Sequence, residues 1–223
     1  MLFLAVFCGF LAENQREHFI EHKREKQFIL SLINDLKLDT TGLESKISFM
    51  KTKLLRIDSV LYPLTKLQND KLPVGICIIL SKVLYTRHFF SNDGTIQQLK
   101  ASGGLRLIRK RGAVDSLEAY HYQIKRIMLR QESTIANNIE VGKTLNNFID
   151  GKDYFENTLD SVYGSKPYAP DKLVKIHPPY LNELINSLMS VRSRDNFDVA
   201  MLNDAKKKAV NMINYLRNEY NLK

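Results

Sequence analysis

The first twelve residues of the chain, Met1–Ala12, contain no polar side chain, and charged residues begin at Glu13. A helix on the surface of a globular protein needs a polar face towards water, and this segment has none. A helix that crosses a membrane needs about 20 apolar residues, whereas twelve residues reach only about 18 Å. The pattern therefore predicts that residues 1–12 are the remnant of a truncated transmembrane helix.

Two other interpretations of residues 1–12 stay open. Apolar runs of about 10–14 residues are often buried core helices, and this segment would then begin the core of the protein. A cleavable signal peptide is the second alternative, but it needs a basic region before the apolar stretch and a small-x-small cleavage site after it. Leu2 follows Met1 directly and Leu11-Ala12-Glu13 is a poor cleavage site, which disfavours the signal peptide.

Composition indicates an ordered, helix-rich protein. Of the 223 residues, 44% are hydrophobic and 26% are charged, which is ordinary for a globular domain. The ten glycines and six prolines are few for this length, and this favours long helices over tight turns. Cys8 and Cys77 are too few for a disulfide framework, so we expect two free thiols.

Apolar residues recur at steps of three and four along most of the chain, which is the period of one helix face. No glycine or proline interrupts Leu11 to Leu38, so we expect the apolar helix to continue as a juxtamembrane helix over residues 13–38. A helical bundle domain is expected over residues 39–223. The predicted fold is therefore all-α, with a truncated N-terminal transmembrane helix that continues into a multi-helix bundle.

Turn-forming residues mark the expected helix ends. Asp39-Thr40-Thr41-Gly42 is expected to end the first helix, and Gly151 to end a long helix over residues 113–149. The run Val74–Leu80 is too short for a second membrane span and predicts a buried helix, with a β-strand as the local alternative. An irregular stretch is expected over residues 163–179. The other helices are expected over residues 43–66, 72–89, 95–99, 154–162, 180–191 and 197–220. The inward positions expected for the long helix are Leu117, Tyr120, Ile124, Ile127, Ile135, Ile139 and Leu145.

The net charge of +9 is unevenly distributed. Residues 13–37 carry five basic and five acidic side chains, whereas residues 100–130 carry eight basic side chains and two acidic ones. Nucleic-acid motifs and aromatic stacking platforms are absent beside this charge, which disfavours a nucleic-acid partner. Arg109, Lys110 and Arg111 flank a glycine turn, and we predict that they form a surface contact with an acidic protein partner or with anionic lipid headgroups.

No residue pattern marks a catalytic, cofactor or metal site. His18 and His22 stand one helical turn apart, but Phe19 replaces the Glu that a zinc protease needs, and two ligands do not complete a site. Gly142-Lys143-Thr144 imitates the end of a phosphate-binding loop, yet it lies within a helix pattern. His121 is expected to be a core or surface residue rather than a general base. We therefore predict no catalytic residue, no cofactor and no metal, and a protein that is not an enzyme.

Several segments are similar to segments of one protein family. They are Phe3–Val6, Gly9–Asn14, Arg16-Glu17, Arg24–Lys26, Leu32–Asp39, Leu99–Ile108 and Leu216–Tyr220. The chain resembles an uncharacterised family of membrane-anchored bacterial proteins, common in Bacteroidetes, with one N-terminal span and a helical soluble part. The resemblance implies a longer N-terminus than this sequence has and a location in the bacterial inner membrane. It carries over no catalytic residue.

These observations predict a membrane-tethered interaction or scaffolding module, attached to the bilayer as a single-pass protein through its N-terminal helix. The alternative is an extracytoplasmic, sensor-like helical bundle that binds a small ligand between its helices. A ligand-responsive state of the soluble part would favour the sensor, and constant co-purification with a protein would favour the scaffold.

Overall fold

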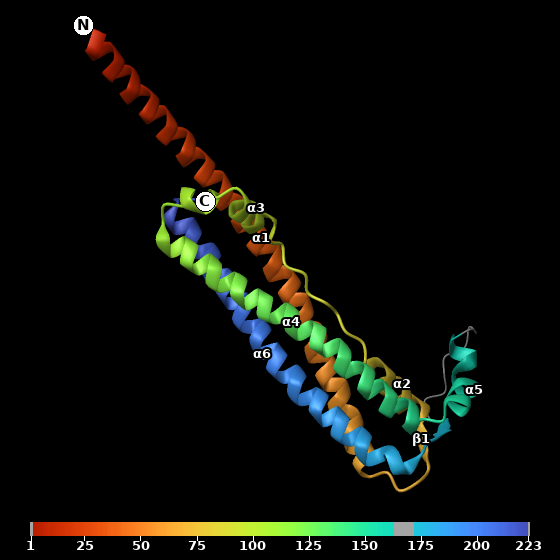
Figure 1. Cartoon of the computed structure of the whole chain (residues 1–223). Coiled ribbons are helices and arrows are strands. Elements are labelled where there is room, and N and C mark those ends of the chain that lie inside the picture. Colours follow the sequence, from red (N-terminus) through yellow and green to blue (C-terminus); the bar gives the residue numbers. More distant parts are fainter. Residues whose placement is uncertain (1, 163–171, 223) are drawn as a thin grey trace. The chain divides into compact units, whose positions relative to one another are not determined.

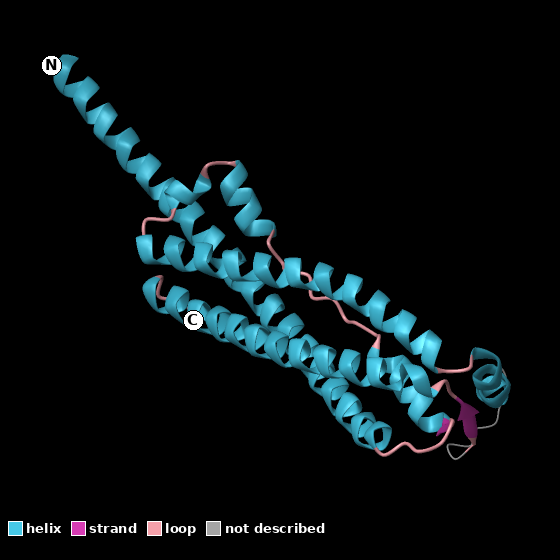
Figure 2. Ribbon diagram, turned by 60° about the horizontal axis from the view of Figure 1, so that its bottom comes forward, coloured by secondary structure: helices cyan, strands magenta, loops and turns pink. Residues whose placement is uncertain are grey.

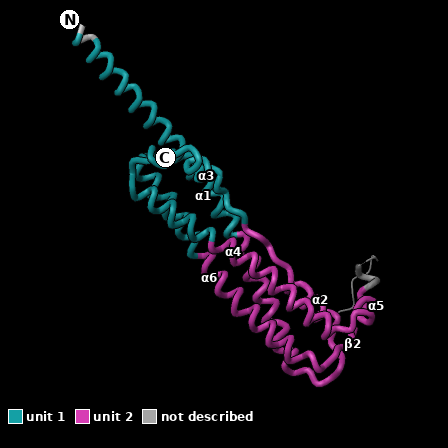
Figure 3. Tube along the Cα trace, viewed as in Figure 1, with its two compact units in different colours: residues 1–44, 90–125, 204–223 teal, residues 45–89, 126–203 magenta. Residues whose placement is uncertain are grey.

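The computed structural model describes residues 2–162 and 172–222, so most of the stretch predicted to be irregular, residues 163–171, lies outside the described residues. Helix makes up 83% of the structure, which confirms the predicted all-α class (Figure 2). The chain divides into two compact units (Figure 3). Unit 1 comprises residues 1–44, 90–125 and 204–223, and unit 2 comprises residues 45–89 and 126–203.

Three long helices dominate the chain, and each contributes residues to both units (Figure 1). They are α1 (Leu2–Thr65), α4 (Arg111–Phe148) and α6 (Leu181–Glu219). The shorter helices are α2 (Val74–Val83), α3 (Gly94–Ala101) and α5 (Gly151–Val162), with the 3-10 helices η1 (Gly104–Leu107) and η2 (Pro178–Tyr180). The strands β1 (Lys71–Pro73) and β2 (Leu173–Lys175) pair antiparallel with Leu72 opposite Val174.

The core of unit 1 is built from α1, α3, α4 and α6. Its α1 stripe follows the predicted helical period, and its buried apolar side chains include Ile29, Leu32, Leu36, Leu43, Ile96, Leu99, Leu117, Tyr120, Ile124, Ala209, Met212 and Leu216. Burial of such side chains from the four helices removes apolar surface from water, which is the main driving force for the packing.

The N-terminal turns of α1 extend beyond the rest of unit 1 (Figure 3). Their described side chains are exposed, and Phe10 retains 69% of its accessible surface. This exposure contradicts the alternative in which residues 1–12 form a buried core helix. Helix α1 runs unbroken from these turns into the bundle, as the absence of glycine and proline over 11–38 predicted. Within the described residues, no helix is both long enough and apolar enough to cross a membrane.

The predicted helix end at Asp39–Gly42 is wrong, because α1 continues through it. The buried Asp39 carboxylate accepts hydrogen bonds from the backbone N–H of Asn92 at 2.6 Å and from the Tyr120 hydroxyl at 2.8 Å. The Thr40 and Thr41 hydroxyls both donate back to the Lys37 carbonyl within the helix. Residues typical of a turn are therefore used here for tertiary contacts and for bonds along the helix.

The core of unit 2 collects side chains from α1, α2, α4, α6 and the small sheet. Its largest buried members include Ile57, Leu64, Leu72, Leu80, Phe148, Ile176 and Leu184. Burial raises the pKa of the Cys77 thiol to about 12, so this free cysteine is a packing group rather than a reactive one. The helix predicted over residues 72–89 begins at Val74, because residues 71–73 pair with residues 173–175 instead.

The same predicted helix ends at Val83 rather than at Phe89, because side chains of α4 hydrogen-bond to the backbone that follows it. The Gln131 side chain accepts a hydrogen bond from the Phe89 backbone N–H at 2.8 Å and donates to the Phe89 carbonyl at 3.0 Å. The Asn138 amide donates to the Leu84 carbonyl at 3.0 Å. Since the backbone of residues 84–89 finds these partners on α4, it does not need helical hydrogen bonds there.

Two positions of α4 that were predicted to face inward are exposed, because this part of α4 turns polar side chains inward. Ile135 and Ile139 are 46% and 57% exposed, and the face that turns inward carries the polar residues Gln131, Thr134 and Asn138 instead. The predicted end of this long helix near Gly151 is close to the observed one, but Gly151 opens α5.

The two helices predicted over residues 180–191 and 197–220 are one continuous helix, α6. The residues between them include Asp195, which is buried in unit 2, as is Asp198 three residues further along the same face. Each pairs with a cation, Asp195 with Lys53 at 3.0 Å and Asp198 with Arg130 at 2.6 Å. The interruption of the apolar pattern is therefore a polar part of the core rather than a turn.

Candidate functional site

The predicted surface contact, Arg109, Lys110 and Arg111, lies in unit 1 between η1 and α4. Ile108 has an extended backbone that ends η1, and Arg111 is the first residue of α4. All three basic residues are exposed. The structure therefore places the triplet at the surface of unit 1, where its surroundings decide what it can bind.

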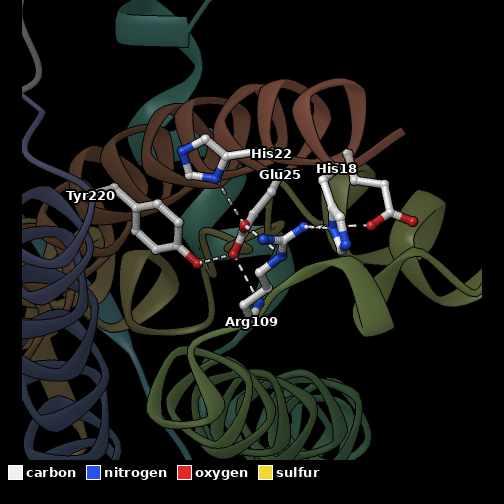
Figure 4. A network of polar contacts seen from close by, with 6 residues as sticks. His18, His22, Glu25, Arg109 and Tyr220 are labelled. Atoms are coloured by element: carbon white, nitrogen blue, oxygen red, sulfur yellow. Dashed lines mark hydrogen bonds and ion pairs between the residues drawn. The ribbon is translucent and has the colours of Figure 1, made fainter. Parts of the chain in front are cut away.

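A buried carboxylate, Glu25 of α1, organises these surroundings (Figure 4). It accepts a hydrogen bond from the Arg109 backbone N–H at 2.8 Å and another from the Tyr220 hydroxyl at 2.6 Å. A carboxylate is costly to bury unless donors replace its water, and these two bonds supply that replacement. Burial and the bond to Glu25 raise the pKa of Tyr220, which keeps the phenol a donor.

Two further side chains, those of His22 and Arg109, lie near this carboxylate at longer range (Figure 4). His22 Nδ1 lies 3.5 Å from Glu25 Oε2, and Arg109 Nε lies 4.0 Å from the same oxygen. The Arg109 guanidinium also lies 3.5 Å from a Glu21 oxygen and 3.5 Å from His18 Nδ1. The two histidines singled out by their spacing thus contact charged side chains of unit 1. Among the described residues, no set of three or more His, Cys, Asp or Glu side chains is placed to hold a metal ion.

Lys110 is held in a separate ion pair. Its ammonium lies 2.9 Å from a Glu219 oxygen, and this hydrogen bond raises the pKa of Lys110. Glu219 ends α6 and Tyr220 follows it, so the end of α6 and the segment before α4 are attached to the same part of α1. An acidic partner that recruits Arg109 or Lys110 would have to compete with these internal carboxylates, whereas Arg111 stands in the first, exposed turn of α4.

Sequence reasoning did not single out Glu25 or Tyr220. Glu25 lies in the charge-balanced run of residues 13–37, where it looks like one more solvated residue. A signal was nevertheless present, because Glu25 precedes Ile29, Leu32 and Leu36 at helical spacing and so belongs to the inward face. An acidic residue on that face predicts a buried partner.

The other residues considered from the sequence lie in structural surroundings rather than in a site. His121 lines a cavity of about 20 Å³ in unit 1, and its burial and the nearby Lys100 lower its pKa. Thr144 lies within α4 and donates to Glu183 at 2.8 Å, so the Gly142-Lys143-Thr144 segment is helical and not a phosphate-binding loop.

Two cavities among the described residues are small. One in unit 2 measures about 30 Å³ and the one beside His121 about 20 Å³, which is room for one or two water molecules. An organic ligand commonly needs about 300 Å³ or more. A hollow of about 540 Å³ lies on unit 2, but it is open and lined by polar residues of α4 and α6.

Comparison of this chain with protein-family models, with curated proteins and with solved structures finds no match. The resemblance to a membrane-anchored family therefore stays a prediction.

Proposed function

We propose that this protein is a membrane-attached helical interaction module. The apolar N-terminal turns of α1 bury themselves in lipid, and the helical units present surfaces to a protein partner. The observation that carries the proposal is the exposure of the described side chains before Glu13, including Phe3, Phe7 and Phe10. Phe3 and Phe7 stack on each other, and beyond that contact no packing among the described residues accounts for these aromatic side chains.

Lipid fits this segment better than a protein groove does. A groove covers one face of a helix, whereas residues 2–12 have no polar side chain on any face. Transfer of one exposed Phe, Leu or Val side chain from water to an apolar phase contributes about 1.5–3 kcal/mol. As a helix, residues 2–12 extend about 17 Å, or about half of the hydrocarbon layer of roughly 30 Å. The segment by itself therefore inserts into the bilayer without crossing it.

An interaction role is favoured over the sensor-like alternative by the shape of the cavities. The cavities of about 30 Å³ and 20 Å³ would have to open by an order of magnitude to hold an organic ligand, and the larger hollows of about 540 Å³ and 340 Å³ between α4 and α6 are open to solvent. A protein partner needs only surface, and surface is already present at the exposed start of α4.

Liposome flotation tests the membrane attachment with a matched pair of variants. Phe10→Asp and Leu55→Asp each place a carboxylate on α1 at side chains of nearly equal exposure, 69% and 70%. We expect the wild type and Leu55→Asp to float with neutral vesicles, also at high salt, and Phe10→Asp to lose most of the floating fraction. Equal flotation of the two variants, or a wild type that stays at the bottom of the gradient, would contradict the proposal.

The basic contact is tested most cleanly at Arg111. Reversing Arg109 or Lys110 would also place a new carboxylate against Glu21, Glu25 or Glu219, which confuses binding with stability. We expect Arg111→Glu to weaken flotation with vesicles that contain anionic lipid at low salt and to leave the helix content unchanged. Lys51→Glu, at an exposed lysine of α1 in unit 2, is the control. Tight binding of RNA or DNA at physiological salt, with no preference for anionic vesicles, would overturn the contact.

A further inference from the structure

Unit 2 contains a buried group of charged side chains that the proposed function does not use. Lys46 and Lys53 of α1 face Asp195 and Asp198 of α6, and all four are buried. Lys53 Nζ lies 3.0 Å from Asp195, and Arg130 Nε lies 2.6 Å from Asp198. Buried charges are costly unless they are paired, and each of these aspartates lies beside a cation, although neither Asp195 oxygen has a hydrogen-bond partner among the described residues.

Lys46 differs from the other cations of this group because its bonded partner is neutral. Its ammonium donates a hydrogen bond to the Arg87 backbone carbonyl, whose dipole compensates only part of a full charge. Burial lowers the pKa of Lys46 to about 8, with nearby Lys53 adding to the effect and Asp198 opposing it. The protein therefore holds a lysine ammonium in its interior at neutral pH without a carboxylate of its own.

The cavity of about 30 Å³ lies beside Lys46. The charged side chains of Lys46, Lys53 and Arg130 lie around it with the two aspartates, which leaves an excess of one positive charge, while the exposed Arg87 contributes its backbone carbonyl. Arg194 adds a further cation behind Asp195, with its Nε 3.6 Å from an Asp195 oxygen. This excess favours an anion over a cation in the cavity.

The size of the cavity limits which anion fits. About 30 Å³ is room for one or two waters, which is about the space that a single chloride ion occupies. Phosphate or an organic acid would need the surrounding side chains to move apart. We propose that this cavity binds one halide-sized anion, chloride in solution, as the counter-ion of Lys46.

The test compares thermal unfolding of the full chain at pH 7, in non-ionic detergent, as sodium chloride replaces sodium gluconate at constant ionic strength. Gluconate is too large for the cavity. The midpoint of the wild type should rise with the logarithm of chloride concentration, by roughly 3–6 °C at ten times the dissociation constant. Lys46→Met should abolish this rise, and Lys51→Met, at an exposed lysine of the same helix, should keep it.

Two results would overturn the proposal. One is an equal midpoint of the wild type in chloride and in gluconate, which is the outcome expected if the cavity holds water only. The other is a chloride effect that persists in Lys46→Met, because the effect would then be a general salt effect. If Lys46→Met fails to fold, the width of the chloride-35 NMR signal in the presence of the wild-type protein shows whether chloride binds. Broadening that bromide reverses supports the site, and no broadening rejects it.

Discussion

Glu25 shows how one buried carboxylate can fix three chain segments. Removing it leaves the Arg109 backbone N–H and the Tyr220 hydroxyl without their acceptor. An unsatisfied buried donor costs about 1–3 kcal/mol, so we expect Glu25→Ala to lower the free energy of unfolding by about 2–4 kcal/mol in urea. Glu21→Ala is the control, because Glu21 is half-exposed and its loss should cost less than about 0.5 kcal/mol. Equal effects would show that Glu25 is not the organising residue.

Lys46 gives a pH dependence whose sign follows from its lowered pKa. The folded-state pKa is about 8 and the reference value is 10.5, so between these values the unfolded chain binds more protons. Stability therefore rises with pH through this window. In gluconate, the stability of the wild type relative to Lys46→Met should rise by about 2 kcal/mol from pH 7.5 to 9.5. Urea unfolding at a series of pH values measures it, and a flat difference between the two proteins would contradict it.

At the scale of the elements, the segment before α3 should depend for its stability on hydrogen bonds from α4. Gln131 bonds both backbone groups of Phe89, so Gln131→Leu should leave them unpaired and destabilise the fold by about 1–3 kcal/mol. Amide hydrogen exchange at Phe89 should quicken correspondingly. Ile139→Gln, on the exposed side of the same helix, should change neither quantity. If Ile139→Gln proved the more harmful variant, the inward face would be the apolar one predicted from sequence.

The sequence predicted the extents of the helices well where apolar spacing was unbroken, as in α1 up to Leu38 and in the first half of α4. It failed where the inward face turns polar. Asp39 was expected in a turn and Asp195 between two helices, and Gln131 and Asp198 were not singled out as inward residues. Each is paired with a side chain or backbone group from a distant part of the chain. Such partners are 40 or more residues away, so no local pattern shows them. The strands escaped notice because they are only three residues long.

For the whole molecule, composition and the helical period of apolar residues predicted the all-α class. The sequence predicted only part of the candidate site. The basic triplet was found as a surface feature, but its engagement by Glu25 and Glu219 depends on how unit 1 folds. The excess positive charge is also not a single patch. Part of it lies inside unit 2 around Lys46, where it is a feature of the core rather than of a binding surface.

The helical bundle should fold without its apolar N-terminal end. A chain that begins at Glu13 lacks the apolar turns and keeps His18, Glu21 and the whole Glu25 network. Because the described side chains before Glu13 are exposed, their removal should leave the circular dichroism spectrum helical and the urea midpoint unchanged. The shortened chain should also stop floating with liposomes. A start at Glu25 itself would be a poorer test, because it would place a new terminal ammonium beside the buried carboxylate. A shortened chain that unfolds or aggregates would show that the apolar turns pack within the protein rather than in lipid.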